Sequence, residues 1–312
     1  SSPKLEEKLN EGLKNSGCEI YRIGLGPTPM LYFASNHFEA DGAIQVTGSH
    51  NPKDYNGFKI VLNQESFFGK DIQKLAYMAN KGYSKSYDGF SKFVKVNSKY
   101  VDEIIKPLKN VEKSGFEKTI VWDCGNGASG PSVEMITAKI PGKHIVLYSD
   151  VNGNFPNHHP DPTDESTLKI LLKKMKEVDA EIGIAFDGDG DRIGVIDKRG
   201  RSVAGDLLTS FLANSITGNN NRNQTIILDI KSSYVAYEKI KSLGFKAEIG
   251  KTGHSNIKKR IKEIKSPLAG EMSGHIFFGD TYFGYDDALY AAIRLLTLTA
   301  NNFELDKFIS TL

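Results

Sequence analysis

Three aspartates alternate with two glycines in the segment DGDGDR at residues 187–192, between two apolar runs that are typical of β-strands. In an extended strand Asp187 and Asp191 would lie roughly 13 Å apart, at about 3.3 Å per residue. Gly188 and Gly190 allow the backbone to curl, so that the carboxylates converge. Converging carboxylates repel one another unless a cation compensates them, and hard oxygen ligands favour Mg²⁺ or Ca²⁺ over softer metals. We therefore predict a divalent-cation site, rather than a solvated acidic turn, with the ligands Asp187, Asp189 and Asp191.

A serine follows a glycine in a second polar segment, TGSHNP at residues 47–52, directly after the apolar run GAIQV. Gly48 permits a tight turn that would present Ser49 at the carboxyl edge of a sheet, where open α/β folds place their ligands. A serine hydroxyl is a weak nucleophile and needs a base or a polarised electrophile beside it, for which His50 and Lys59 are candidates. No Gly-x-Ser-x-Gly motif surrounds the serine, which argues against an α/β-hydrolase. A polar strand-to-loop turn is the alternative interpretation.

The third polar segment, GEMSGH at residues 270–275, combines a carboxylate, a hydroxyl and an imidazole between small residues. The groups belong to Glu271, Ser273 and His275. Together they offer the donors and acceptors that the adjacent hydroxyls of a polyol require. A β-turn with incidental polar side chains is the alternative interpretation.

Two further side chains could meet an anion. Lys231 ends the apolar run TIILDI and could reach a phosphate, although a lysine at a strand end is usually solvated. His254, in the segment KTGHSN, stands near a predicted helix start, where an anion is favoured, or it only caps that helix.

These polar segments need a scaffold, and apolar β runs alternate with helical stretches along the chain up to a last helix that begins at Asp286. Strands separated by helices imply βαβ units. We therefore predict an α/β fold of consecutive layered domains with mixed, largely parallel sheets and the active site in the cleft between them. Lower apolar content around residues 82–95 predicts a linker. We place the domains at residues 1–94 with the serine, 95–201 with the metal site, and 202–312 with the polyol segment.

Composition excludes several classes of protein. The 312 residues carry 40 basic and 38 acidic side chains, a net charge of +2, which argues against nucleic acid as the main partner. No stretch approaches ~20 apolar residues, so we expect no membrane span, and the first residues lack the apolar core of a signal peptide. Only Cys18 and Cys124 are present, which excludes a disulfide scaffold and fits a reducing cytosol. We expect a cytoplasmic monomer or weak oligomer that binds a small molecule.

Several segments together resemble the α-D-phosphohexomutase superfamily, and in particular its bacterial phosphomannomutase/phosphoglucomutase branch. TGSHNPKDYNGFKI (47–60) is similar to the family's phosphoserine loop, DGDGDR to its magnesium loop and GEMSGH to its sugar-recognition loop. Met272 and the form TGSHNP favour this branch over phosphoglucosamine mutases, whose loop typically has alanine before the serine. Further similar segments, in the family's order, are GLGPTPMLYFA (24–34), VNGNFPNHHPDP (151–162), KTGHSNIKK (251–259) and FGYDDALYAAIRLL (283–296).

The resemblance implies an interconversion of hexose 1-phosphate and hexose 6-phosphate, with mannose, glucose or both as the sugar. Phosphorylated Ser49 would donate its phosphoryl group to a hexose monophosphate, and the resulting hexose 1,6-bisphosphate would return its other phosphate to Ser49. Mg²⁺ would be held by that phosphate with Asp187, Asp189 and Asp191. His50, Lys59 and Arg192 would stabilise developing charge or shuttle protons. The substrate would be met by Lys231, His254, Glu271, Met272, Ser273, Gly274 and His275.

The sequence departs from the family at both ends. Members normally start with another strand and an arginine-containing motif, and they end with a fourth domain that binds the distal phosphate of the substrate. Losing a phosphate clamp removes several charge-assisted hydrogen bonds. We therefore expect a fragment that binds Mg²⁺ but turns over hexose phosphates poorly.

Three alternatives remain at this point. A haloacid-dehalogenase-like, magnesium-dependent phosphatase would use Asp187 as its nucleophile, with Asp286 and Asp287 as a later acidic pair. A phosphoglucosamine mutase would share the mechanism but act on another sugar. A non-catalytic sugar-phosphate-binding protein would form no phosphoryl adduct, whereas a mutase would carry a stable phosphate on Ser49.

Overall fold

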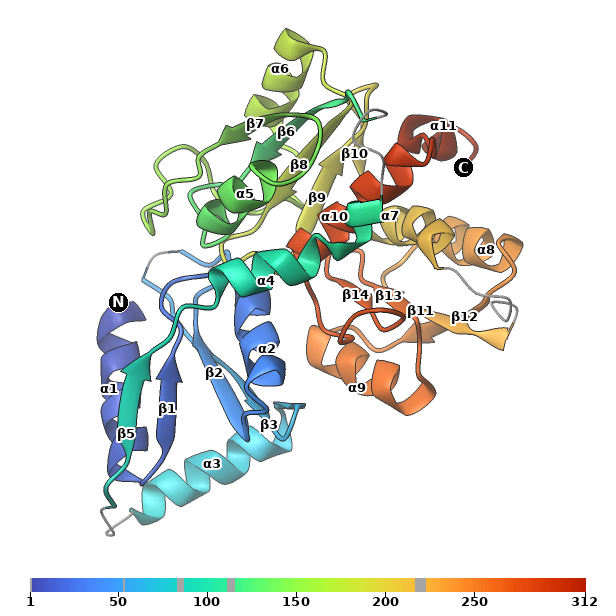
Figure 1. Cartoon of the computed structure of the whole chain (residues 1–312). Helices are drawn as coiled ribbons and strands as arrows, with labels where there is room; N and C mark the ends of the chain where they lie inside the picture. Colours follow the sequence, from blue (N-terminus) through green and yellow to red (C-terminus); the bar gives the residue numbers. More distant parts are fainter. Residues whose placement is uncertain (1, 53, 83–86, 111–115, 217–222) are drawn as a thin grey trace.

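The computed structural model describes residues 2–52, 54–82, 87–110, 116–216 and 223–312 (Figure 1). Lys53 of the predicted phosphoserine loop and residues 83–86 of the predicted linker lie outside the described residues. The chain forms three α/β parts in sequence order, which we call the first, middle and last parts. In Figure 1 the first part is mostly blue and cyan, the middle part green to yellow, and the last part orange and red.

The first part combines helices with two small sheets. Its elements are α1 (Ser2–Asn15), β1 (Glu19–Arg22), α2 (Thr28–His37), β2 (Gly42–Val46), β3 (Phe58–Leu62), β4 (Glu65–Phe67), α3 (Lys70–Lys81) and β5 (Phe90–Phe93). β2, β3 and β4 form an antiparallel sheet, and β5 pairs in parallel with β1. The prediction of a linker around residues 82–95 is therefore wrong for Phe90–Phe93, which return to the first part as a strand.

The middle part is a five-stranded sheet in the order β10-β9-β8-β6-β7. Its elements are α4 (Asn97–Ile104), the 3₁₀ helix η1 (Lys106–Asn110), β6 (Thr119–Asp123), α5 (Gly130–Thr137), β7 (Lys143–Leu147), α6 (Lys169–Val178), β8 (Ile182–Phe186), β9 (Ile193–Ile196) and β10 (Ser202–Val203). β7, β6 and β8 are parallel, and β9 and β10 are antiparallel to their neighbours.

Alternation along β6 explains why the central strands are apolar throughout. Trp122 packs in the apolar cluster that includes residues of α5, whereas the adjacent Val121 packs in the cluster that includes residues of α6. Successive side chains of a strand point to opposite faces, so both faces of the sheet are covered. The predicted metal segment then falls on the short connection between the buried strands β8 and β9.

The last part has a four-stranded sheet in the order β12-β11-β13-β14. Its elements are α7 (Gly205–Leu212), the 3₁₀ helix η3 (Ala213–Ser215), β11 (Thr225–Asp229), α8 (Tyr234–Ser242), β12 (Lys246–Gly250), α9 (His254–Ile264), β13 (Leu268–Gly270), β14 (Ile276–Phe278), α10 (Ala288–Ala300) and α11 (Leu305–Ile309). β12, β11 and β13 are parallel, and β14 is antiparallel to β13.

Helix α10 joins the last part to the rest of the molecule. It is apolar almost all round, and its residues are buried from Ala288 to Leu296. It contacts β9 and α4 of the middle part as well as α7 and β14 of its own part. The predicted last helix begins two residues later than expected, because Asp287 caps it by accepting a hydrogen bond from the backbone of Tyr290.

The mixed α/β architecture predicted from the sequence is confirmed. The apolar runs in the sequence did not indicate the short strands β4, β5, β10, β13 and β14 or the short helix α11. Among the described helices, none combines the length and the apolar character that crossing a bilayer requires.

Candidate functional site

The predicted nucleophile and the predicted metal segment meet where the first and middle parts touch. Ser49 Oγ donates a 2.9 Å hydrogen bond to Asp187 Oδ2, across 138 residues of sequence. The backbones approach just as closely, because a Cβ on Gly188 would lie 2.2 Å from the carbonyl oxygen of Ser49. Ser49 has φ +52°, and its N–H donates to Thr47 Oγ1 at 2.8 Å, which fixes the tight turn after β2. The structure therefore brings the serine to the aspartates.

The three aspartates of the segment turn inward and are buried. One carboxylate oxygen from each of Asp187, Asp189 and Asp191 lies within 4.8 Å of the others. The backbone N–H groups of Asp191 and Arg192 both donate to Asp187 Oδ1 at 3.1 Å, and Gly190 supplies the positive φ of +73°. Burial, followed by repulsion from the carboxylates of Asp191 and Asp189, raises the pKa of Asp187 well above its ordinary value. We call these three residues the acidic trio.

Lys59 of β3 places its ammonium between two members of the acidic trio. Its Nζ donates to Asp189 Oδ2 at 2.7 Å and also to Asp191 Oδ2. Burial opposes the charge on Lys59, but Asp189 and Asp191 outweigh it and hold the pKa of the ammonium well above the usual range. Burial likewise favours a neutral Asp191, and Lys59 and His275 overcome it and hold the pKa of Asp191 well below the usual range. Lys59, whose side chain is 20% exposed, is therefore a largely buried cation paired with buried anions.

The acidic trio fits a divalent metal ion. Asp189 Oδ1 is buried and has no hydrogen-bond partner among the described residues. Such an oxygen is costly to bury unless a ligand meets it. The donor set consists of carboxylate oxygens, which hard divalent cations prefer. With Ser49 Oγ bonded to Asp187, a phosphate on the serine would stand directly beside this cluster.

Sequence reasoning missed the residue that anchors the metal segment to helix α2. The Thr28 side chain donates to Asp189 Oδ2 at 2.6 Å, and its backbone N–H donates to the carbonyl of Asp189 at 2.8 Å. In the sequence, Thr28 precedes Pro29, a pair that is typical of a helix start and indicates no other role. Its second role depends on a contact between parts that no local pattern reports.

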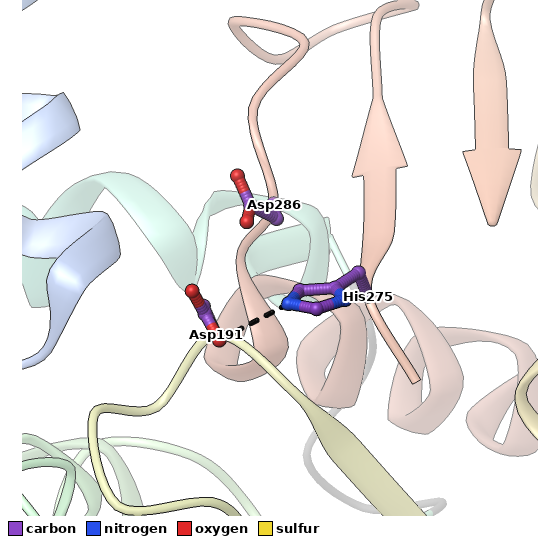
Figure 2. A group of neighbouring side chains, drawn as sticks. All are labelled: Asp191, His275 and Asp286. Carbon is purple, nitrogen blue, oxygen red and sulfur yellow. Dashed lines mark ion pairs between the residues drawn. The ribbon is translucent and has the colours of Figure 1, made fainter. Parts of the chain in front are cut away.

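The last part contributes His275, which lies beside the acidic trio. Figure 2 shows Asp191 and Asp286 on the same side of its ring, with Nε2 directed at Asp191 Oδ1 at 3.3 Å. On the other side of the ring, Nδ1 lies 3.1 Å from Glu271 Oε2. Burial opposes protonation, but these carboxylates outweigh it, Asp191 first, and raise the pKa of His275 to about 10. His275 is therefore a second buried cation at the trio, between the metal segment and the polyol segment.

The other residues of the polyol segment surround His275. Glu271 is buried and also accepts a 2.6 Å hydrogen bond from the backbone N–H of Gly253, whereas Ser273 Oγ lies 3.1 Å from His275 Nδ1. Met272 is exposed, and Gly274, at φ +90°, packs so closely that a Cβ would lie 2.4 Å from a backbone oxygen of β9. The segment is thus held against the middle part through Gly274.

Of two predicted proton or charge carriers, His50 lies next to Ser49 and Arg192 lies next to His275. His50 Nδ1 is 3.2 Å from Ser49 Oγ, and burial, followed by the positive charge of Arg192, lowers the pKa of His50. The His50 and His159 rings lie edge to face, with their centroids 6.4 Å apart. The segment at residues 151–162 therefore also borders the site. Arg192 Nε lies 3.4 Å from His275 Nε2.

The two remaining predicted residues differ in their outcome. His254 begins α9 and stacks on His275, with ring centroids 5.7 Å apart. Lys231 follows β11, is exposed, and has no hydrogen bond or ion pair with the described residues. The structure therefore places His254 at the site and leaves the role of Lys231 a prediction.

Behind His254 lies a second buried group that the sequence analysis did not assign. It consists of Tyr32, Lys258 and Asp286, which belong to three of the family-like segments. Tyr32 and Lys258 also line a cavity of about 280 Å³ between α2, β4 and α9. The only sequence signal for Lys258 is its spacing of four residues from His254, which places both side chains on one helix face.

Comparison with known proteins identifies the family to which the chain belongs. Models of the phosphoglucomutase/phosphomannomutase α/β/α domains I, II and III match residues 1–85, 98–200 and 204–311. A solved phosphoglucomutase/phosphomannomutase family protein from Burkholderia thailandensis superposes with a TM-score of 0.92 at 36% identity, over 99% of this chain and 68% of that one. The chain belongs to this family. The resemblance to the α-D-phosphohexomutase superfamily predicted from the sequence is thereby confirmed.

Two further relatives extend the comparison. The phosphomannomutase/phosphoglucomutase of Pseudomonas aeruginosa is 40% identical over 308 residues, 97% of this chain and 64% of the relative. This chain spans only 64% of the length of that curated relative. An N-acetylphosphoglucosamine mutase of Aspergillus fumigatus, solved with GlcNAc-6P and magnesium, shares the fold at 14% identity and a TM-score of 0.64, over 100% of this chain and 83% of that one.

Proposed function

We propose that the protein to which this chain belongs is a phosphohexomutase that interconverts hexose 1-phosphate and hexose 6-phosphate, with glucose, mannose or both as the sugar. The observation that carries the proposal is the 2.9 Å hydrogen bond from Ser49 Oγ to Asp187 inside the acidic trio. Family membership favours this reaction over that of a haloacid-dehalogenase-like phosphatase. The N-acetylglucosamine-type neighbour shares only the fold, so no specific observation favours an amino sugar.

Ser49 is the residue that carries the phosphoryl group in this proposal. The bond from Ser49 Oγ to phosphorus breaks as a hydroxyl oxygen of the sugar bonds to phosphorus. The sugar hydroxyl gives its proton to a base, and the departing Ser49 Oγ takes up a proton. In the second half the other phosphate of the hexose 1,6-bisphosphate returns to Ser49 Oγ, which gives up its proton while the departing sugar oxygen takes one up. His50 Nδ1, 3.2 Å from Ser49 Oγ, is placed to hold the proton of Ser49. The reaction is balanced because each half moves one phosphoryl group and one proton.

Cationic side chains stabilise the charge that the transfer exposes. Lys59 reaches the acidic trio from β3, His275 lies beside Asp191, and Arg192 lies beside His275. Preorganised cations in a buried site stabilise a phosphoryl group in flight without reorganising. The trio would hold Mg²⁺, which when bound neutralises charge on the transferring phosphoryl group.

The last part would orient the sugar. Glu271 and Ser273 flank His275, and both offer groups that suit adjacent hydroxyls. His254, Met272, Gly274 and Lys231 complete the substrate-facing set that we propose. A hexose phosphate bound there would present a hydroxyl to phosphorylated Ser49, and turning the bisphosphate end for end would present the other.

The proposal also includes the domain boundaries and the cellular location of the protein. We propose three domains that carry the serine, the metal site and the polyol segment, at residues 1–94, 95–203 and 204–312. The sequence analysis placed the second boundary after residue 201, and we now propose it after β10, because Ser202 and Val203 pair with β9. We propose a cytoplasmic location, where a reducing environment keeps the free thiols of Cys18 and Cys124 unpaired.

Phosphate localisation tests the proposal. The protein is exposed to glucose 1,6-bisphosphate with Mg²⁺, and intact mass and peptide mapping then locate any phosphate. We expect one acid-stable phosphate on Ser49, which Ser49→Ala abolishes. The matched control is Ser98→Ala, which alters an exposed serine of α4 and should leave the adduct unchanged.

The other outcomes identify the alternatives. An acid-labile phosphate on Asp187 would indicate the phosphatase mechanism. Binding of the bisphosphate without any adduct would indicate a sugar-phosphate-binding protein. Either result would contradict a phosphoserine mutase.

A further inference from the structure

Helix α9 carries a lysine whose surroundings are not explained by the proposed reaction. The Lys258 side chain is only 12% exposed, and it lies one helical turn after His254. Its Nζ lies 2.8 Å from Asp286 Oδ1, 3.1 Å from Tyr32 Oη and 3.1 Å from His254 Nδ1. A lysine ammonium has three donors, so each of them has an acceptor here. The position of this nitrogen is therefore fixed from three sides.

The three acceptors come from three separate segments of the chain. Asp286 is fully buried and directly precedes the cap of α10, and Tyr32 comes from α2 of the first part. Lys258 also lies over the Tyr32 ring, 4.2 Å from its centroid. The ammonium thus joins α9 to α10 and, across the boundary between parts, to α2.

The geometry decides which ring nitrogen of His254 carries a proton. Nδ1 faces both members of the ion pair, because it also lies 3.3 Å from Asp286 Oδ2. The contact with Lys258 is the shorter of the two, at 3.1 Å, and an ammonium can only donate a hydrogen bond. Lys258 and His254 are therefore hydrogen-bonded when the Nδ1 lone pair accepts a proton from Lys258. The proton of a neutral His254 then resides on Nε2.

This arrangement reaches the acidic trio through a ring stack. The His254 ring lies nearly parallel to the His275 ring, at 15°, and Figure 2 shows His275 directed at Asp191. Rotating or flipping the His254 ring would therefore break its contact with Lys258 and its stacking on His275.

We propose that Lys258 is a positioning residue that sets the tautomer and the orientation of His254, so that His254 presents Nε2–H as a fixed donor to the substrate. Asp286 and Tyr32 hold the ammonium in place for this purpose. A donor fixed before binding loses no rotational freedom when it meets a sugar or phosphate oxygen. The proposal deepens the proposed function and rests on it only for the role of the substrate.

Nitrogen-detected NMR of the histidine rings tests the tautomer without any substrate. The chain has 7 histidines, and His254→Gln assigns the signal of interest. At about pH 8, where an ordinary imidazole is neutral, we expect wild-type His254 to carry its proton on Nε2. Lys258→Met should remove this preference and give a mixture of tautomers.

The neighbouring lysine provides a matched control. Lys259→Met makes the same change of charge on the same helix, but Lys259 is exposed and has no hydrogen bond or ion pair with the described residues. It should leave the His254 signal unchanged. A wild-type proton on Nδ1 would overturn the proposal even if Lys258→Met failed to fold. An unchanged signal in folded Lys258→Met, or the same change in Lys259→Met, would also overturn it.

Kinetics separates positioning from mere stability. With glucose 1-phosphate and the full-length enzyme, we expect Lys258→Met to lower kcat/KM by about 100-fold, the order that a misplaced group costs. Lys259→Met should retain kcat/KM within about twofold, the spread of an uninvolved surface change. If the wild-type protein turned over no hexose phosphate, the proposed function would fail, whereas the NMR result would still decide the role of Lys258.

Discussion

Lys59 and His275 are two buried cations that face three buried carboxylates. These two cations compensate the negative charge of the acidic trio only in part, because Asp189 Oδ1 has no hydrogen-bond partner among the described residues. A bound divalent ion would complete the compensation. The stability of the chain should therefore depend on the metal, and most strongly when one of the protein's own cations is missing.

The variant Lys59→Met tests this dependence. Removing one partner of a buried ion pair leaves an uncompensated buried charge, so in EDTA we expect the free energy of unfolding to fall by about 3–5 kcal/mol. Added Mg²⁺ should stabilise the variant more than the wild type, because binding to the folded state alone shifts the equilibrium. Denaturant titrations with and without Mg²⁺ measure both effects.

Lys74→Met is the matched control for that variant. Lys74 pairs with Asp71 on the exposed surface of α3, where ion pairs contribute little. It should change neither the free energy of unfolding nor the response to Mg²⁺ appreciably. Equal losses for Lys59→Met and Lys74→Met would contradict a buried role for Lys59.

The loops between elements hold the site together by backbone contact. The connection between β8 and β9 packs against the turn after β2 so tightly that a Cβ on Gly188 would meet Ser49 O at 2.2 Å. Side chains could adjust to such a contact, but two backbones cannot without moving one loop. The distance between the serine and the acidic trio therefore depends on a glycine that carries no chemistry of its own.

We expect Gly188→Ala to separate the two loops. The cost of forcing a methyl group into a packed contact is about 1–3 kcal/mol, and the displaced Ser49 should lose its bond to Asp187. Phosphorylation by glucose 1,6-bisphosphate should therefore drop steeply, as measured by mass spectrometry. Gly153→Ala is the control, since its Cβ would meet nothing within 4 Å. A fully phosphorylated Gly188→Ala protein would refute this account.

Local patterns in the sequence predicted the elements and motifs that depend on neighbouring residues. The alternation of aspartate and glycine at 187–192 indicated the acidic trio, and the apolar runs separated by helical stretches indicated the α/β fold. Strand β5 was missed because its four residues form a strand by pairing with β1, which is distant in the sequence. Thr28 and Lys258 were missed for the same reason, since their partners Asp189 and Tyr32 lie 161 and 226 residues away.

At the scale of the whole molecule, α10 determines how the parts depend on one another. This helix is buried between β9 and α4 of the middle part and the sheet of the last part. If either part unfolds, the face of α10 that packs against it becomes exposed to solvent, and the helix loses part of what holds it against the other part. The middle and last parts should therefore unfold together rather than as independent units.

Leu295→Ala tests this coupling. Leu295 is fully buried, so the truncation should lower the free energy of unfolding by about 2–5 kcal/mol. Hydrogen exchange should accelerate in β8 and β11 to a similar degree, because both depend on the same helix. Leu25→Ala, at a side chain that is 69% exposed, should affect neither strand. Faster exchange confined to the last part would show that the parts unfold independently.

The hydrogen bond between Ser49 and Asp187 has a consequence for synthesis on the ribosome. A chain emerging from its amino end exposes the serine long before its acceptor, 138 residues later, has been made. Until both segments have folded and docked, the Ser49 hydroxyl lacks its acceptor and Asp187 lacks its donor. For the reaction that we propose, a partly translated polypeptide would therefore hold an inert alcohol, and reactivity would begin only with completed assembly.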